Sequence, residues 1–542
     1  MEGRGLARRR PGAGTARGTA TGGETPVDDI RKADVVVVGA GPTGLAVAVG
    51  LRQHGVDVAV VEKAALGKRE ARAGIIWQRA LEVLADLGCA REMTAEGIKL
   101  RRVEVFAEGR RAWRMGMECA GTAFPNPLSI EQDAVERLLG ERLVALGGRV
   151  EWSTEAVAVR TGGDGAEVDV RTGDGGLTTL RCAWVIGCEG AHSVVRKGLG
   201  IPFEGGRRPD LQCVQLNAVP DWKVPYRPGH TYFFLERGLS MGVSPRPGGG
   251  YRFFAFLTDP DPTVEGPPGV EEMRDLVARS AHEPGVRLAP TDPPWANRAR
   301  FQDRVAATLR EGRALLAGDS AHLWAPIGGH GLNTGLRGAH NLAWKVAAAV
   351  RGWAADPFAL LDTYSTEQRL TAEKVMREMR HNLLELPPTA LALRGMRLVG
   401  GPVMSTPWAS GRIRSMLSDL TMHHRESALS QGGGGDRLPD PFVRVRGRHC
   451  RLHDLLSYQR WTLLAAPGAK GPGMTDDHLR ALVAGYRAPV DILRPRTDPD
   501  TVPRLPGKAL VLVRPDRHIG LRTDRVEELE AYLRRWFARD AV

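Results

Sequence analysis

The feature that most constrains the fold is a turn of glycines between a run of valines and a helical stretch. Asp34–Val38 holds four consecutive valines, and a run without alternation is typical of a parallel strand buried on both faces. Gly39-Ala40-Gly41-Pro42-Thr43-Gly44 follows, then a helical period, then a second apolar strand that ends at Glu62. Glycines at this spacing permit a tight turn and bring a pyrophosphate close to a helix N-terminus. We therefore predict a dinucleotide-binding βαβ unit within an α/β fold.

The acid that ends the second strand adds a further constraint. Glu62 lies 23 residues after Gly39, where a carboxylate can accept hydrogen bonds from a ribose. These residues predict a bound dinucleotide but leave open whether it is FAD or NAD. The residues expected to contact it are Gly39, Gly41, Thr43, Gly44, Glu62 and Lys63.

Two later segments, each following an apolar strand, carry polar residues suited to a flavin. Residues 184–196 read WVIGCEGAHSVVR and residues 313–322 read RALLAGDSAH. Asp319 ends the second of these strands, where its carboxylate can accept a hydrogen bond from a polyol hydroxyl. The run 326–333 (PIGGHGLN) leads into a helix, so its backbone N–H groups favour developing negative charge, as at N1 and O2 of a reduced flavin.

Taken in order, these segments resemble those of the class A flavoprotein monooxygenases, the family of para-hydroxybenzoate hydroxylase and phenol hydroxylase. That family has GxGxxG, then a DG segment, then a GD segment followed by P-x-G-G-x-G-x-N, and the resemblance covers residues 33–395. Residues 69–78 are similar to its R-A-G segment, whose arginine reaches the FAD, and residues 132–137 to its Q-x-x-x-E-R flavin-contact segment. The resemblance implies FAD as cofactor, with contacts from Arg72, Gln132, Asp319, Pro326, Gly329, Gly331, Leu332 and Asn333.

The resemblance also implies an activity. In this family NADPH, or NADH, reduces the FAD without a second GxGxxG domain, and this sequence has none. Reduced flavin then captures O₂ as a C4a-hydroperoxide, which hydroxylates a phenolic or polycyclic aromatic substrate, while the protein supplies placement and a dry pocket. Two alternatives stay open. One is a Baeyer–Villiger or epoxidising monooxygenase, and the other is a non-catalytic flavin-binding protein that acts as a partner module.

Three positions depart from the family pattern. Glu189 replaces the usual Asp of the DG segment, which keeps the charge and adds a methylene on the NADPH side of the site. Gly338 stands where many relatives have Asp, and Gln368 stands where Arg is usual in the Y-x-x-E-R helix. The flavin loop, residues 326–333, matches the family pattern throughout.

The substrate side is predicted to be a sheet. Short apolar runs separated by Pro and Gly turns fill 206–300, a pattern typical of successive strands. Phe254 and Phe256 alternate onto one face of their strand, and we expect Phe234 and Met241 to join them above a bound ring. The alternative for all four is an ordinary sheet core.

Two residues near the flavin loop are further candidates for the pocket, Trp324 and His330. A base that deprotonates a phenol would help hydroxylation, and His330 is the predicted catalytic residue. The alternative for this histidine is a hydrogen-bonding spacer within the loop.

The expected fold class is α/β, with a Rossmann-like FAD-binding domain of the para-hydroxybenzoate hydroxylase type interleaved with a mixed β-sheet substrate domain. A C-terminal thioredoxin-like domain is implied because 512–520 (LVRPDRHIG) is similar to the phenol hydroxylase and polyketide hydroxylase branch. That domain lacks CxxC in the family and here, so packing or dimer contact is its expected role. The predicted units are a disordered basic tail (1–30), the FAD-binding domain (31–205, with a sheet segment at about 100–130), the substrate sheet (206–300), the GD segment and helices (301–430), a linker (431–441) and the C-terminal domain (442–542).

Charge and cysteine content exclude other classes. The formal net charge is +12, but the first twenty residues carry five Arg against one Glu and no basic block follows, which argues against nucleic-acid binding. The six cysteines include no CxxC pair, so we expect neither a metal site nor a disulfide scaffold. The same pattern favours a cytoplasmic location. The longest uncharged apolar stretch, 35–51, is interrupted by glycines and a proline, so no membrane span is predicted. A homodimer is only a default expectation.

Overall fold

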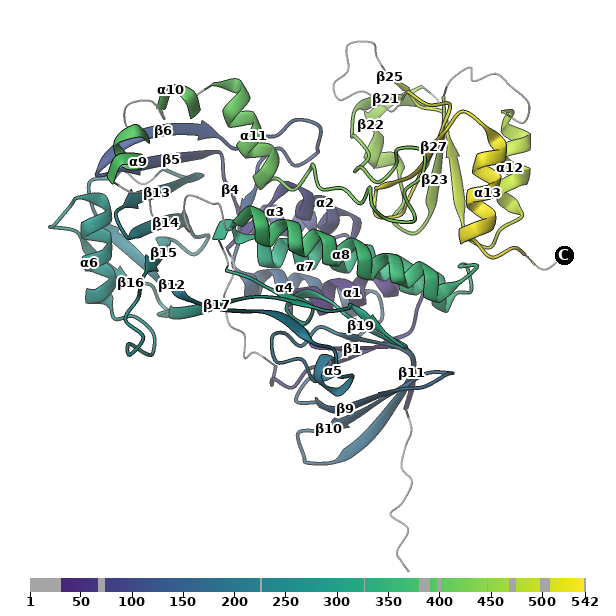
Figure 1. The fold of residues 1–542 in the computed structure, drawn as a ribbon, viewed down its shortest axis with the longest axis horizontal. Coiled ribbons are helices and arrows are strands. Elements are labelled where there is room, and N and C mark those ends of the chain that lie inside the picture. The colour runs from purple at the N-terminus through teal and green to yellow at the C-terminus, as the bar shows by residue number, and fades with distance from the viewer. Residues whose placement is uncertain are drawn as a thin grey trace, which may run out of the picture.

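The computed structural model describes residues 31–66, 74–224, 227–325, 327–379, 390–396, 401–404, 406–445, 447–466, 474–497 and 507–540. These residues form three parts, and the C-terminal part lies to one side (Figure 1). The tail predicted over 1–30 lies outside the described residues. No helix among those described is long and apolar enough to cross a membrane.

The N-terminal part is a mainly parallel sheet with helices around it. Its strands are β1 (Arg31–Val38), β2 (Val58–Val61), β8 (Val150–Glu151), β9 (Glu155–Thr161), β10 (Ala166–Arg171), β11 (Leu177–Gly187), β18 (Arg310–Glu311) and β19 (Ala314–Leu316). Its helices are α1 (Pro42–Gln53), α2 (Gln78–Asp86), α3 (Ala90–Glu96), α4 (Gln132–Ala145), α5 (Val194–Gly198), α7 (His330–Val350) and α8 (Pro357–Met379).

The strand order is β18-β19-β11-β1-β2-β8, with β10 and β9 added beside β11. The valines of β1 are at most 4% exposed, because β1 lies between its parallel neighbours β11 and β2. Helix α1 forms over the stretch predicted to be helical, and it packs against α7. The carboxyl ends of these strands therefore meet at one edge, where ligands bind in such sheets.

The second part is a nine-stranded sheet. Its elements are β5 (Arg102–Ala107), β6 (Arg110–Gly116), β12 (Phe203–Asp221), β13 (His230–Glu236), β14 (Leu239–Pro245), β15 (Tyr251–Thr258), β16 (Arg287–Pro290), β17 (Ala296–Ala306), β20 (His322–Leu323) and the helices α6 (Val270–Ala281), α9 (Ala390–Gly395), α10 (Gly401–Met404) and α11 (Pro407–Leu417). The order is β20-β17-β12-β15-β14-β13-β5-β6, with β16 on β12. Strands β5 and β6 enter it from inside the first part, and β17 continues six residues past the predicted boundary at 300. A small sheet of β3 (Ile75–Ile76), β7 (Leu128–Ser129) and β4 (Ile98–Lys99) adjoins them.

The C-terminal part is a small α/β unit. Its elements are β21 (Phe442–Val445), β22 (Arg448–Arg451), β23 (Trp461–Ala465), β24 (Val490–Leu493), β25 (Arg496–Thr497), β26 (Leu510–Val513), β27 (Ile519–Thr523), α12 (Asp476–Ala484) and α13 (Val526–Trp536). Strand β23 pairs with β24 in parallel and with β26 antiparallel, and β27 completes the sheet. This mixed sheet with α12 and α13 is the thioredoxin-like arrangement implied by the sequence.

The glycine-rich run predicted as a linker packs against the C-terminal part instead. The Gln431 N–H donates to Gly520 O and the Leu438 N–H to Arg517 O, both at 2.8 Å. Leu438 is fully buried. Gly435 adopts φ +97°, and a Cβ there would lie 2.6 Å from the Arg425 backbone. Gly435 therefore permits a left-handed turn and a close backbone approach.

A buried cluster of charges joins the C-terminal part to helices α7 and α8. Glu367 of α8 accepts hydrogen bonds from Arg514 Nη1 at 2.8 Å and Nη2 at 2.9 Å, and from Lys345 Nζ at 2.8 Å. Asp516 accepts from Asn341 Nδ2 at 2.7 Å. Burial alone would raise the pKa of Glu367, but Arg514 and Lys345 outweigh it and hold that pKa well below its usual range. The carboxylate is therefore charged and depends on its cationic partners.

We expect Arg514→Met to lower the free energy of unfolding by about 3–5 kcal/mol, because it leaves a buried carboxylate without its bidentate partner. Urea unfolding of the full chain measures this. Arg160→Met is the matched control: Arg160 pairs with Asp169 at the surface, and loss of such a pair costs about 0–1 kcal/mol. Equal effects of the two changes would contradict the prediction.

Candidate active site

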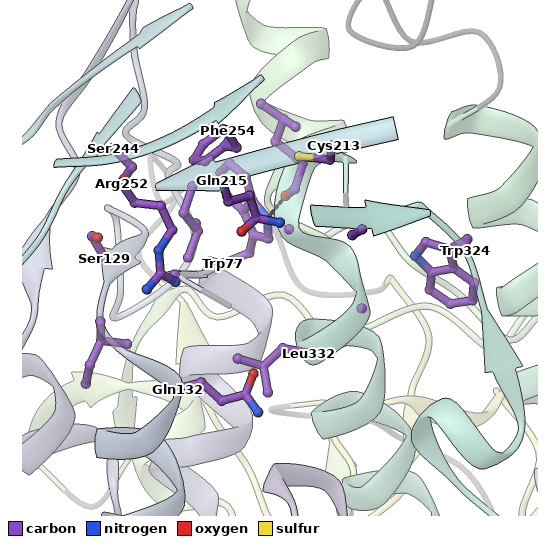
Figure 2. A pocket seen from close by; sticks show the side chains of 18 of the residues that line it. Trp77, Ser129, Gln132, Cys213, Gln215, Ser244, Arg252, Phe254, Trp324 and Leu332 are labelled. Atoms are coloured by element: carbon purple, nitrogen blue, oxygen red, sulfur yellow. Dashed lines mark hydrogen bonds between the residues drawn. The ribbon is translucent and has the colours of Figure 1, made fainter. Parts of the chain in front are cut away.

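A cavity of about 1530 Å³ lies between the two sheets. One side is formed by the turns after β1, β2, β11 and β19 together with the starts of α4 and α7. The other side is formed by β12, β13, β15 and β17. In Figure 2, Gln132 and Leu332 point in from helices, opposite Gln215, Cys213 and Phe254 on the sheet.

The dinucleotide motif reaches this cavity through Gly41, Thr43 and Glu62. Helix α1 has no side-chain cap, and a Cβ on Gly41 would have nothing within 4 Å. Uncapped N–H groups and open space at a helix N-terminus fit a pyrophosphate. Glu62 accepts hydrogen bonds from the N–H groups of Ala40 at 2.8 Å and Ala64 at 2.9 Å. Its carboxylate is thereby oriented, and each oxygen keeps a lone pair for a ribose hydroxyl.

The other residues predicted from this motif lie differently. Gly39 has φ +101°, and a Cβ there would lie 2.6 Å from Cys188 O. A Cβ on Gly44 would lie 2.0 Å from Gly39 O. Both glycines therefore act by allowing the turn and its packing, and neither lines the cavity. Lys63 is exposed and also does not line it.

Glu189, which departs from the family pattern, links the other two motifs. Its Oε1 accepts hydrogen bonds from Ser193 Oγ and Val195 N, both at 2.8 Å. Its Oε2 accepts from Ser320 Oγ at 3.1 Å. The longer side chain thus caps α5 and reaches the turn that carries Asp319, which lines the cavity.

Asn333 holds the flavin loop to the segment before α2. Its Oδ1 accepts from Trp77 N at 2.8 Å, and its Nδ2 donates to Ile75 O at 2.9 Å and Gly329 O at 2.6 Å. Trp77 also donates through Nε1 to Gly328 O at 2.7 Å. Asn333 is fully buried and does not line the cavity, so its role in the structure is to shape the loop.

Other residues of the loop face the cavity. Gly329, Gly331 and Leu332 line it, and α7 begins there without a side-chain cap. Backbone N–H groups at this helix end are therefore placed to interact with negative charge. Gln132 lines the cavity from the first residue of α4. Arg72 and Pro326, also predicted to contact FAD, lie outside the described residues.

Two of the four sheet residues predicted to lie above a bound ring line the cavity. Phe254 and Phe256 line the cavity, but Phe234 and Met241 do not. Met241 stands opposite Phe234 and Ala255 in the register, which places the predicted pair on the other face of the sheet, in a separate buried core. Successive residues of a strand face opposite sides, so the residues of β13 that line the cavity are Thr231, Phe233 and Leu235.

Polar residues in the cavity wall were missed by the sequence analysis. Gln215 and Asn297 line the wall. Arg252 also lines it, donating to Glu131 Oε2 at 2.7 Å and Asn217 Oδ1 at 2.9 Å. Glu131 also accepts from Arg246 at 2.6 Å. The available signal was an arginine inside an otherwise apolar strand, which is rarely buried without a partner.

The loop residues Trp324 and His330 take different places. Trp324 lines the cavity and stacks on His322 with ring centroids 4.7 Å apart. Burial lowers the pKa of His322 to about 4. His330 does not line the cavity; it is 3% exposed and stacks on Trp77 at 6.1 Å. Its role as a base that contacts substrate stays a prediction. In the structure the His330 ring lies behind Trp77, which lines the cavity.

Comparisons with known proteins identify the family of this chain. Residues 32–379 match the family described as an FAD binding domain, and 432–540 match the C-terminal domain of aromatic-ring hydroxylases. The chain is 29% identical to the rifampicin monooxygenase of Streptomyces venezuelae, over 93% of this chain and 98% of the relative. It is 32% identical to the dialkyldecalin synthase of Streptomyces rugosporus, over 93% and 98%.

A solved structure is similar across almost its whole length. The anhydrotetracycline hydroxylase OxyS from Streptomyces rimosus has a TM-score of 0.75 and 29% identity, over 94% of this chain and all of that chain. The chain belongs to the FAD-dependent aromatic-ring hydroxylases, flavoprotein monooxygenases of the para-hydroxybenzoate hydroxylase fold. This confirms the sequence-based predictions of fold class, FAD and enzyme class.

We expect Glu62→Ala to weaken FAD binding about 10- to 100-fold, because a hydrogen bond to a charged group contributes about 1.5–3 kcal/mol. Quenching of FAD fluorescence during titration of the apoprotein measures the dissociation constant. Asp57→Ala removes an exposed carboxylate from the same βαβ unit and is the control. An unchanged FAD affinity in Glu62→Ala would show that this carboxylate does not hold the cofactor.

Proposed function

We propose that this enzyme hydroxylates a polycyclic aromatic substrate, using NAD(P)H and O₂. The observation that carries the proposal is the cavity, whose volume of about 1530 Å³ exceeds the roughly 300–1,000 Å³ of ordinary ligand pockets. It runs from the dinucleotide motif to the aromatic face of the sheet, so it has room for a substrate beside the cofactor. The names of the rifampicin and anhydrotetracycline relatives support a large substrate.

The chain's own residues act by placement and electrostatics. FAD, when bound, supplies the oxygen chemistry. Backbone N–H groups at the start of α7, among Gly329–Leu332, are positioned to stabilise negative charge. Trp77, Phe254 and Phe256 give this end of the cavity an apolar wall that excludes water. Gln215 offers an amide in the same wall, which can orient a substrate hydroxyl or carbonyl.

The central experiment is anaerobic reduction of the enzyme-bound FAD by NADPH, followed through the visible absorbance of the flavin. Phenols and polycyclic quinols are added in turn, and products formed after O₂ is admitted are weighed by mass spectrometry. We expect one polycyclic compound to accelerate reduction and to gain one oxygen atom as a phenol. A lactone or an epoxide would identify the other monooxygenase reactions. Absence of NADPH oxidation with every compound would contradict the proposal. This outcome has to be tested because one relative is named a synthase and not a monooxygenase.

We expect Phe254→Leu to raise the KM for the substrate about two- to tenfold, because an aromatic contact contributes about 0.5–1.5 kcal/mol beyond burial. Steady-state kinetics with the compound found above measure it. Phe253→Leu, the same change one residue earlier on the opposite face of β15, is the matched control. A larger rise of KM in Phe253→Leu would contradict the assigned face.

A further inference from the structure

Asp419 stands two residues past the end of α11, the helix that contributes Ile413, Met416 and Leu417 to the cavity wall. Its φ is +58°, a left-handed conformation that is unfavourable for residues other than glycine, and less so for Asp and Asn. The preceding Ser418 accepts a hydrogen bond through its carbonyl from Arg79 N at 3.1 Å. The end of α11 is therefore fixed against the start of α2.

The carboxylate of Asp419 faces two side chains of α7, the His330 ring and the Arg337 guanidinium. Its Oδ1 lies 3.5 Å from His330 Nδ1, and its Oδ2 lies 3.4 Å from Arg337 Nε. Asp419 and His330 are each 3% exposed. Burial would raise the pKa of Asp419, but Arg337, His330 and, more weakly, Lys374 of α8 outweigh it and lower that pKa below its usual value. A charged carboxylate thus lies against the first helical residue of α7.

His330 carries this contact to the flavin loop. Its ring stacks on Trp77 with an angle of 18° between the planes. Trp77 in turn holds both ends of the loop, through Gly328 O at 2.7 Å and Asn333 Oδ1 at 2.8 Å. Displacement of the His330 ring would remove the support behind the indole that shapes the loop.

We propose that Asp419 is a positioning residue for the flavin site: it holds His330 against Trp77, and so couples α11 at the cavity wall to the flavin loop. Asp419 does not line the cavity, so we assign its effect on the flavin site to the contact with His330 and, through it, Trp77. The inference depends on FAD binding, which the family establishes, and not on the proposed substrate. A failed search for a polycyclic substrate would therefore leave it standing.

The test is FAD titration of apoprotein variants, read by flavin fluorescence and by the visible band shape of bound FAD. Asp419→Asn keeps the size and tolerates the left-handed backbone, while Asp419→Gly removes the side chain and relieves any strain. We expect both to raise the dissociation constant for FAD about tenfold, the effect of one charged contact, and to change the band shape. Asp259→Asn is the matched control, because Asp259 also has positive φ, at +50°, and is exposed.

A double-mutant cycle separates coupling from a general loss of stability. If Asp419 acts through His330, Asp419→Asn in a His330→Gln background changes the FAD dissociation constant by less than about twofold. Effects that multiply, or wild-type affinity and band shape in both Asp419 variants, would overturn the proposal. Thermal unfolding of each apoprotein is measured in parallel, and Asp419→Gly keeps the test decisive if Asp419→Asn folds poorly.

Discussion

The bidentate ion pair between Glu367 and Arg514 is the contact on which the arrangement of the flavin site depends. Both side chains are fully buried, and neither can lose its partner without leaving a charge in the interior. Lys345 and Asn341 of α7 bind the same carboxylate. The pair therefore fixes α7, whose first turn lines the cavity, against the C-terminal part.

Other contacts along α7 and α2 act in the same direction. His340 stacks on Tyr458 of the C-terminal part with ring centroids 4.2 Å apart, and its Nε2 lies 3.1 Å from Asp86 Oδ2. Arg517 donates to Asp86 through Nε at 2.8 Å. The C-terminal part thus contacts both α7, which begins at the flavin loop, and α2, which follows Trp77. This gives a physical reason for a thioredoxin-like unit that has no CxxC pair.

Sequence reasoning could predict the elements with strong local signals and failed where distant segments meet. The valine run and glycine turn predicted β1 and α1, because buried parallel strands and pyrophosphate turns have residue requirements of their own. The sequence could not show which side of the sheet Phe234 occupies. Alternation tells which residues of one strand share a side, but it does not give the register with the neighbouring strand. The glycine run at 431–441 gave a linker signal, since composition does not show what backbone approaches it.

Two departures from the family pattern also concern a contact that the sequence alone does not reveal. A Cβ on Gly338 would lie 3.3 Å from Gln368 Oε1, so the positions where relatives usually carry Asp and Arg face each other here. In this chain a glycine and a glutamine have replaced both. Residues 338 and 368 belong to different helices, and nothing in their spacing indicates the contact. Asp419 was missed for the same reason, because its partners belong to α7.

The buried charges of the C-terminal part hold α7 in place beside the cavity. Hydrogen exchange measured by mass spectrometry under native conditions, with wild type compared to Arg514→Met, is the experiment that tests this role. We expect faster exchange across α7, including its first turn at the flavin loop, with little change in β1 and β2. Faster exchange confined to β26 and β27, with α7 as protected as in wild type, would contradict it.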